Sequence, residues 1–214
     1  MTALDEQQAT LRALFEAIAE RDARQVGGWL ERAPDLARLA CDFGATREDP
    51  TSYFFDTIRH YAYAGDTALH LAAAAHFAEG VQALMKLGAN VRARNRRGAE
   101  PLHYAADGVP GSIAWDPNGQ AAVVRSLIAA GADPNAADAS GVMPLHRAVR
   151  SRCAAAVQAL LEGGADVDRS NKSGSTALEL AHTNTGRGGS GSAEAREQQA
   201  QIVELLLAHG ATKR

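Results

Sequence analysis

The stretch Gly65-Asp66-Thr67-Ala68-Leu69-His70 decides the fold, because its pattern returns three more times along the 214-residue chain. The later copies are Gly98-Ala99-Glu100-Pro101-Leu102-His103, Gly141-Val142-Met143-Pro144-Leu145-His146 and Gly174-Ser175-Thr176-Ala177-Leu178-Glu179. Their first glycines are 33, 43 and 33 residues apart. A second landmark follows each copy: Gly88-Ala89-Asn90, Gly131-Ala132-Asp133, Gly164-Ala165-Asp166 and Gly210-Ala211-Thr212. Self-similarity at such a period indicates a repeat architecture.

Each copy predicts two helices joined by a turn. Pro101 and Pro144 stand where a first helix begins, a position that needs no backbone N–H. Thr67 and Thr176 can cap that helix with a hydroxyl group. Apolar residues then recur at helical spacing, as in Val81, Leu84 and Met85. Because one such unit cannot bury its apolar face alone, the units are expected to stack.

This pattern resembles the ankyrin-repeat family, whose unit reads roughly G-x-T-P-L-H-x-A-A, then a V-x-x-L-L helix, then G-A-D-x-N. The resemblance implies an all-α solenoid of about five helix-turn-helix units, caps included, with β-hairpin loops. We expect one domain over residues 1–214. Its parts are an N-terminal capping unit (1–40), an aromatic hairpin finger (41–64), repeats at 65–97, 98–140 and 141–173, and a C-terminal capping repeat with a Gly/Ser insertion (174–214).

The chain departs from the family pattern in its caps and its spacing. Glu100 and Met143 replace capping threonines, which predicts weaker caps in those two units. Insertions of 10 and 13 residues lengthen the distance between the two glycine landmarks in the units that start at Gly98 and Gly174. We expect both insertions, at 107–120 and 183–196, to be surface loops.

Residues before the first repeat predict a helix pair and a hairpin. Leu11, Leu14, Phe15 and Ile18 form a helical stripe, and a second helix should begin after Asp22. The following segment, 53–63, is rich in aromatic and β-branched residues and predicts an elongated β-hairpin. A period of two would place four of its aromatic side chains on one face, which either packs on the solenoid or binds a partner: Tyr53, Phe55, Tyr61 and Tyr63.

Composition favours a cytoplasmic, monomeric globular protein. The net charge of −3 provides no overall basic field for nucleic acid. Two cysteines fit a reducing compartment, and neither a signal sequence nor a membrane span is evident. An abundance of Ala, Arg and Gly is typical of a GC-rich bacterial genome.

The sequence predicts no catalytic or metal site and no cofactor. His70, His103 and His146 occupy equivalent positions in successive units, which stacking separates by about 8–10 Å. That distance is too great for the three to share one zinc ion. The family resemblance implies that these histidines are structural and form hydrogen bonds between neighbouring loops. No nucleophile with an adjacent base is apparent, so we expect no enzyme activity.

The resemblance implies that partners bind at the loop tips and the exposed, concave face of the first helices, and to these we add the inserted loops. Residues carried over to that surface are Tyr63, Asp66, Arg94, Arg96, Arg97, Asp107, Trp115, Ser140, Arg150 and Lys172, with Tyr53, Phe55 and Tyr61 added by the finger. Four arginines fall within positions 92–97. They form either a solvated tip or a clamp for an acidic or phosphorylated partner.

We therefore expect a protein-binding adaptor, inhibitor or regulator that does not enter membranes. An alternative is an enzyme or small-molecule-binding protein with a pocket between the finger, the 107–120 loop and the groove. Nucleic-acid binding through the arginine tip is a third class, and the acidic balance of the chain argues against it.

Overall fold

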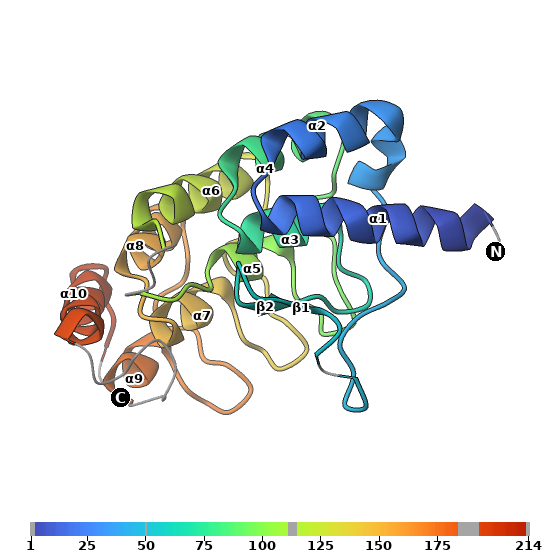
Figure 1. Ribbon diagram of the computed structural model, residues 1–214. Coiled ribbons are helices and arrows are strands. Elements are labelled where there is room, and N and C mark those ends of the chain that lie inside the picture. The colour runs from blue at the N-terminus through green and yellow to red at the C-terminus, as the bar shows by residue number, and fades with distance from the viewer. Residues whose placement is uncertain (1–2, 50, 111–114, 184–192, 213–214) are drawn as a thin grey trace. The chain divides into compact units, whose positions relative to one another are not determined.

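The computed structural model describes residues 3–49, 51–110, 115–183 and 193–212 and is dominated by helices (Figure 1). Residues 1–101 and 102–214 form two compact units, called unit 1 and unit 2. In chain order the elements are α1 (Ala3–Ala19), α2 (Ala23–Arg32), the 3-10 turn η1 (Pro34–Ala37), β1 (Phe54–Phe55), β2 (His60–Tyr61), α3 (Ala68–Ala74), α4 (Ala78–Lys86), α5 (Pro101–Ala105), α6 (Pro117–Ala129), α7 (Pro144–Arg150), α8 (Ala154–Glu162), α9 (Ala177–His182) and α10 (Ala193–Ala208). No described helix combines the length and apolarity needed to cross a membrane.

Unit 1 begins with the predicted helix pair. Helix α1 packs against α2 and α3, and α4 packs against both α2 and α3. The stripe on α1 is entirely buried, as its spacing predicts, because this face meets the neighbouring helices. Asp22 caps α2 by accepting a hydrogen bond from the backbone N–H of Gln25 at 2.9 Å. The sequence pattern therefore located both helices.

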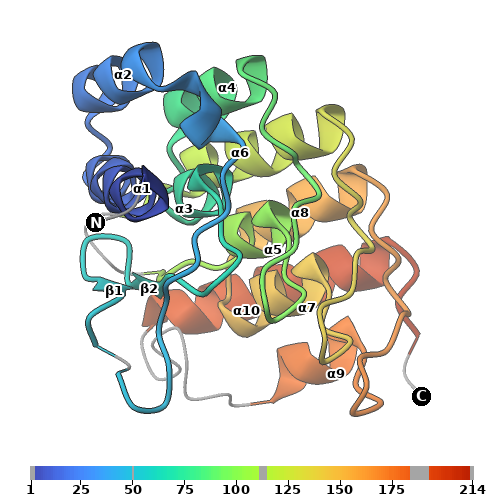
Figure 2. The same cartoon turned by 90° about the vertical axis from the view of Figure 1, so that its right-hand side faces the viewer.

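Unit 2 contains three helix pairs. The first helices are α5, α7 and α9, and the second helices are α6, α8 and α10. Helix α8 lies between α6 and α10, and α7 packs against α8 and α9 (Figures 1 and 2). Small residues such as Ala148, Ala156 and Ala159 are buried where helices approach closely.

A tight turn precedes three of the first helices and is held in the same way each time. In unit 1, Asn95 Oδ1 accepts hydrogen bonds from the backbone N–H groups of Arg97 and Ala99 at 2.9 and 3.1 Å. Asp138 and Asn171 make the equivalent pair of bonds in unit 2. These polar side chains fix the exposed tip of each turn, beside a backbone hydrogen bond across the same turn.

His70 and His103 have the structural role that the resemblance implies, whereas His146 Nε2 is buried and has no hydrogen-bond partner among the described residues. His70 Nδ1 accepts a hydrogen bond from the backbone N–H of Thr67 at 3.1 Å, so its Nε2–H donates to Ala99 O at 3.1 Å. His103 likewise donates from Nε2 to Val142 O at 3.1 Å. Each ring thus joins a first helix to the turn of the next repeat.

Met143 provides no side-chain hydrogen bond to cap α7, as predicted. The ring of His146 compensates in part, because its Nδ1 accepts a hydrogen bond from the backbone N–H of Met143 at 3.1 Å. Helix α9, the first helix of the last repeat, has a complete capping box instead. In it Thr176 and Glu179 exchange side-chain and backbone hydrogen bonds.

The two insertions contain more helix than expected. Helix α6 already begins at Pro117, because Asp116 caps it by accepting a hydrogen bond from Asn118 N at 3.0 Å. The prediction of a loop over 107–120 was therefore wrong for 117–120, and residues 111–114 lie outside the described residues. In the second insertion 193–196 belong to α10, and the Gly/Ser stretch 184–192 lies outside the described residues.

A hairpin forms before the first repeat, with a register that the period-two prediction missed. Strands β1 and β2 are antiparallel and two residues long, with Phe54 opposite Tyr61 and Phe55 opposite His60. Cross-strand partners share a face of a hairpin. Phe55 therefore lies on the opposite face from Tyr61, and the predicted four-residue aromatic face was wrong.

Candidate functional site

Aromatic rings and guanidinium groups meet on the hairpin of unit 1 and the turn after α4. The guanidinium carbons of Arg97 and Arg96 lie 4.6 and 5.5 Å from the centroid of the Tyr63 ring. The Tyr61 ring is 6.3 Å from Tyr63 and 4.6 Å from Phe54, between centroids. Arg96 also donates a hydrogen bond to Ala45 O. We call Phe54, Tyr61, Tyr63, Arg96 and Arg97 the arginine–tyrosine cluster.

The hairpin's aromatic residues divide between exposed and packed positions. Tyr61 is 36% exposed. Tyr53 stacks on Phe43 at 5.7 Å between ring centroids, and Phe43 in turn contacts the buried Phe15 at 5.8 Å. Tyr53 is therefore packed on the fold, whereas Tyr61 is left exposed.

Arg94 is held beside the cluster by a buried carboxylate. Its Nε lies 3.1 Å from Glu100 Oε1, and the Arg94 side chain is 53% exposed whereas that of Glu100 is 3% exposed. A buried carboxylate needs such a partner. Glu100, which replaces a capping threonine, thus positions one of the four arginines of the tip.

The side chain of Asp66 has no exposed area, so Asp66 cannot be part of the contact surface that the sequence predicted. Its carboxylate accepts hydrogen bonds from the backbone N–H of Tyr63 at 2.7 Å and from Asn95 Nδ2 at 2.8 Å. These bonds connect two successive turns. Sequence reasoning placed Asp66 at an exposed tip because its partner Asn95 is distant in the chain.

In unit 2, Asp107 belongs to an ionic network. Its carboxylate accepts hydrogen bonds from Arg147 Nη1 at 2.8 Å and Ser151 Oγ at 3.2 Å. Arg147 also lies 3.6 Å from Asp138 and stands over the Tyr104 ring. Burial disfavours the charged guanidinium, but Asp107, Tyr104 and Asp138 together raise the pKa of Arg147. Arg147 was missed, although it directly follows a motif histidine.

The other predicted residues of unit 2 lie at separate places. Trp115 is partly buried and donates from Nε1 to Gln120 Oε1 at 3.0 Å. Lys172 is exposed, and its Nζ donates to Ala139 O at 2.7 Å. Ser140 is exposed in the turn before α7, and Arg150 is partly exposed at the end of that helix.

Metal and thiol chemistry find little support in the described part of the chain. No group of three His, Cys, Asp or Glu residues there is arranged to hold a metal ion. Burial raises the pKa of the Cys41 and Cys153 thiols to about 12 in each case. Both are therefore protonated at neutral pH, which makes them poor nucleophiles.

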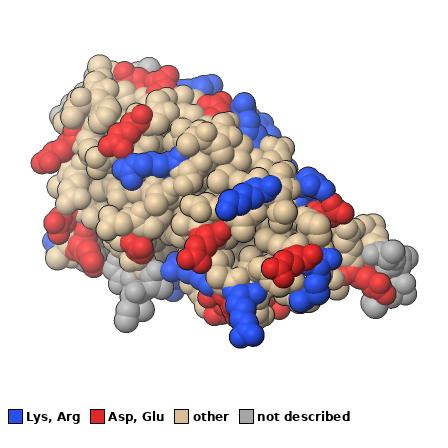
Figure 3. All heavy atoms as spheres, turned by 90° about the horizontal axis from the view of Figure 1, so that it is seen from above, with Lys and Arg blue, Asp and Glu red and all other residues tan. Residues whose placement is uncertain are grey.

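Charged side chains are interspersed on the face drawn in Figure 3, where blue and red groups alternate among the described residues. Among the described residues drawn on this face there is no basic stripe of the kind that nucleic-acid binding uses. The arginine–tyrosine cluster brings two guanidinium groups together in a chain of net charge −3.

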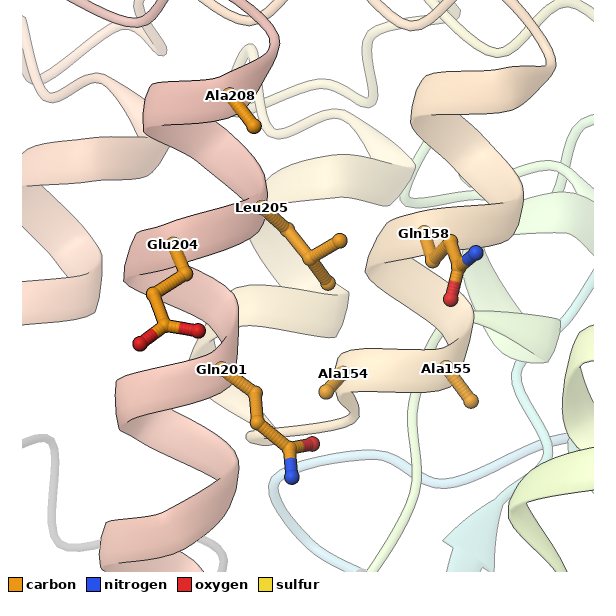
Figure 4. Close-up of a pocket in the computed structure, with 7 residues that line it drawn as sticks. All are labelled: Ala154, Ala155, Gln158, Gln201, Glu204, Leu205 and Ala208. Carbon is orange, nitrogen blue, oxygen red and sulfur yellow. The ribbon is translucent and has the colours of Figure 1, made fainter.

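A groove of about 400 Å³ lies in unit 2 between α8 and α10 (Figure 4). It is lined by Ala154, Ala155, Gln158, Gln201, Glu204, Leu205 and Ala208. None of these residues belongs to the finger or the 107–120 segment, where the alternative prediction placed a pocket.

Comparisons with known proteins agree with the repeat pattern. A family model described as "Ankyrin repeats (3 copies)" matches residues 112–214, and one described as "Ankyrin repeat" matches residues 64–96. "Protein fem-1 homolog A" of Homo sapiens is 38% identical over 90 residues, which are 41% of this chain and 14% of that protein. "E3 ubiquitin-protein ligase KEG" of Arabidopsis thaliana is 40% identical over 102 residues, 47% of this chain and 6% of that protein.

A longer match joins the chain to "Ankyrin repeat and SOCS box protein 6" of Homo sapiens, which is 30% identical over 174 residues. These residues are 77% of this chain and 37% of that protein. The chain thus spans well under half the length of each of these three relatives. What the matches share with it is the repeat region.

Proposed function

The chain belongs to the ankyrin-repeat family, and on this premise we propose that it is a module that binds another protein, as an adaptor, inhibitor or regulator, and not an enzyme. We propose the arginine–tyrosine cluster as its contact surface in unit 1, and a partner with an acidic or phosphorylated segment. One observation carries the proposal: two guanidinium groups from an exposed turn lie over the ring of Tyr63.

The cation–π arrangement suits an anionic partner. A guanidinium that contacts a ring can still donate hydrogen bonds from its other N–H groups, and their fork matches a carboxylate or phosphate group. Arg96 and Arg97 are already held against Tyr63 before a partner arrives. Ordering a mobile side chain costs about 0.5–1.5 kcal/mol on binding, so prior ordering reduces this cost.

The surroundings add charge and apolar surface. Arg94 supplies a third guanidinium, half exposed and anchored by Glu100. Tyr61 supplies an exposed ring next to Tyr63. Tyrosine and arginine are enriched among the residues that dominate binding energy in protein interfaces. The cluster therefore combines the two residue types that such a surface needs.

In unit 2 we retain Trp115, Ser140, Arg150 and Lys172 as proposed contacts, because each is at least partly exposed on a turn, an insertion or a first helix. Asp107 we assign instead to holding Arg147 and Ser151, since both of its oxygens accept hydrogen bonds from those side chains. It would support the surface without being its main contact.

The experiment starts with affinity capture of partners by the immobilised chain and measures the affinity of each purified partner for variants. Arg97→Glu should weaken binding at least tenfold, by roughly the 2 kcal/mol or more that loss of a buried charge pair costs. Arg94→Glu is unsuitable, because it would place a second carboxylate beside the buried Glu100. Arg24→Glu makes the same charge change on exposed α2 and should leave affinity unchanged.

Phosphatase treatment of the partner separates the two anion sources. Loss of binding assigns the contact to a phosphate group, and retained binding assigns it to carboxylates. Equal affinities for the unaltered chain and the Arg97→Glu variant would refute the proposed surface. A melting temperature unchanged by the substitution would exclude unfolding as the cause of any loss.

A further inference from the structure

We propose that the groove between α8 and α10 is a second protein-binding site, which takes a basic amphipathic helix of a partner. The groove lies wholly in unit 2 and shares no residue with the arginine–tyrosine cluster. The inference therefore goes beyond the proposed function and stands on separate observations.

The groove has an apolar floor and a polar rim. Ala154, Ala155, Leu205 and Ala208 provide the apolar lining, and the Leu205 side chain points into the space between the two helices (Figure 4). The three alanines lie in the first turn of α8 and the last turn of α10, where their small side chains leave room for another side chain. A volume of about 400 Å³ accommodates a few apolar side chains of an incoming helix.

The rim carries negative and no positive charge. Of the seven lining residues Glu204 alone is ionisable, it is exposed, and it makes no ion pair with any residue that the structure describes. The nearby Glu162 differs, because its carboxylate is 3.2 Å from Arg125. Glu204 is therefore the carboxylate available to a Lys or Arg of a partner.

An amphipathic helix fits these features better than an extended segment. Apolar side chains at helical spacing can enter the floor between the two helices, while lysines or arginines beside them reach the rim. The amides of Gln158 and Gln201 can accept or donate hydrogen bonds there. With a positive cluster in one unit and a negative groove in the other, the chain can engage two partners of opposite charge.

The test uses a synthetic peptide with leucines at i, i+4 and i+7 and lysines on its flanks, titrated into the isotopically labelled full chain. Amide signals of α8 and α10 should shift, and fluorescence anisotropy gives the dissociation constant. Ala155→Leu fills the groove from a partly exposed position and should weaken binding about tenfold or more. Glu204→Lys should weaken it at least about threefold, as removal of an exposed ion pair does.

Matched controls exclude nonspecific attraction. Glu194→Lys makes the same charge change on exposed α10 away from the groove and should leave the affinity unchanged. A peptide with glutamates in place of the lysines should not bind, and Arg97→Glu should not affect the lysine peptide. Equal binding of the two peptides, equal effects of the two lysine substitutions, or shifts outside α8 and α10 would overturn the proposal. Sedimentation showing a dimer that Ala155→Leu dissociates would also overturn it, by assigning the groove to a second copy.

Discussion

At the scale of single residues, the buried amide of Gln120 joins α6 to the end of α5, to Asp107 and to Trp115. Its Nε2 donates to Ala105 O and Asp107 O at 3.0 and 3.1 Å, and its Oε1 accepts from Trp115 Nε1 at 3.0 Å. Gln120→Leu would keep the size of the side chain. It would leave Ala105 O, Asp107 O and Trp115 Nε1 without their hydrogen bonds to Gln120. We expect a loss of about 1–3 kcal/mol in the free energy of unfolding.

Denaturant titration measures that loss, and tryptophan emission in a Trp29→Phe background should shift to longer wavelength as Trp115 is released. Gln82→Leu on the exposed face of α4 is the control and should change stability by less than about 0.5 kcal/mol. Equal losses in the two variants would show that the Gln120 hydrogen bonds contribute nothing.

His103 gives the fold a pH dependence. Its ring is fully buried, and burial together with Arg147 lowers its pKa from 6.5 to about 4. Between these values the unfolded chain binds a proton that the folded chain does not, so stability is complete above pH 6.5 and falls as the pH drops toward 4. The expected loss is on the order of 3 kcal/mol, at about 1.4 kcal/mol per pKa unit.

Denaturant titrations at pH 7.5 and 4.5 check this prediction. His103→Gln should reduce the stability difference between the two pH values, because glutamine does not titrate. His182→Gln, at an exposed position of α9, should leave the difference unchanged. If both variants keep the full difference, His103 is not its source.

At the scale of elements, α10 is attached to its neighbours by side chains at its N-terminal end. The nearly buried Arg152 donates from Nη1 to Ala195 O at 3.2 Å and to Gln199 Oε1 at 2.7 Å. Gln199 also donates to Ala181 O, and Gln198 accepts from Ala154 N. Arg152→Met should therefore loosen the start of α10 while its later, apolar turns stay packed.

Hydrogen exchange should then accelerate about tenfold for amides near 195–200 and change less near Leu206, which is fully buried. Arg169→Met, at an exposed position of the following loop, is the matched control. Uniform acceleration along α10 would show that Arg152 stabilises the whole helix and not its start.

The sequence predicted the helices well because periodicity and caps are local properties. The stripe on α1 and the hydroxyl cap at Thr176 are examples, and both were found in place. The hairpin register was not predictable in the same way. Four residues separate Phe55 from His60, with Arg59 at a φ of 50°, and this turn length sets which residues pair. The burial of Asp66 likewise depends on Asn95, in the following turn.

At the scale of the whole molecule, the repeats explain the fold, and residues outside the repeated motif provide the proposed contact surface. The hairpin supplies Tyr61 and Tyr63, and the turn after α4 supplies Arg96 and Arg97. The hairpin is an addition to the repeats, whereas the turn recurs before α7 and α9 and lacks this pair of arginines there. A surface made of the hairpin and these arginines is the physical basis for expecting a partner of its own.

Hydrogen exchange of the chain, with and without its captured and purified partner, tests this central claim most directly. Our account predicts slower exchange of backbone amides in 53–63 and 92–99 when the partner is bound. Amides of α2 and α4 should exchange at the same rate in both states. Protection confined to α2 or α4, with none at 92–99, would contradict the account.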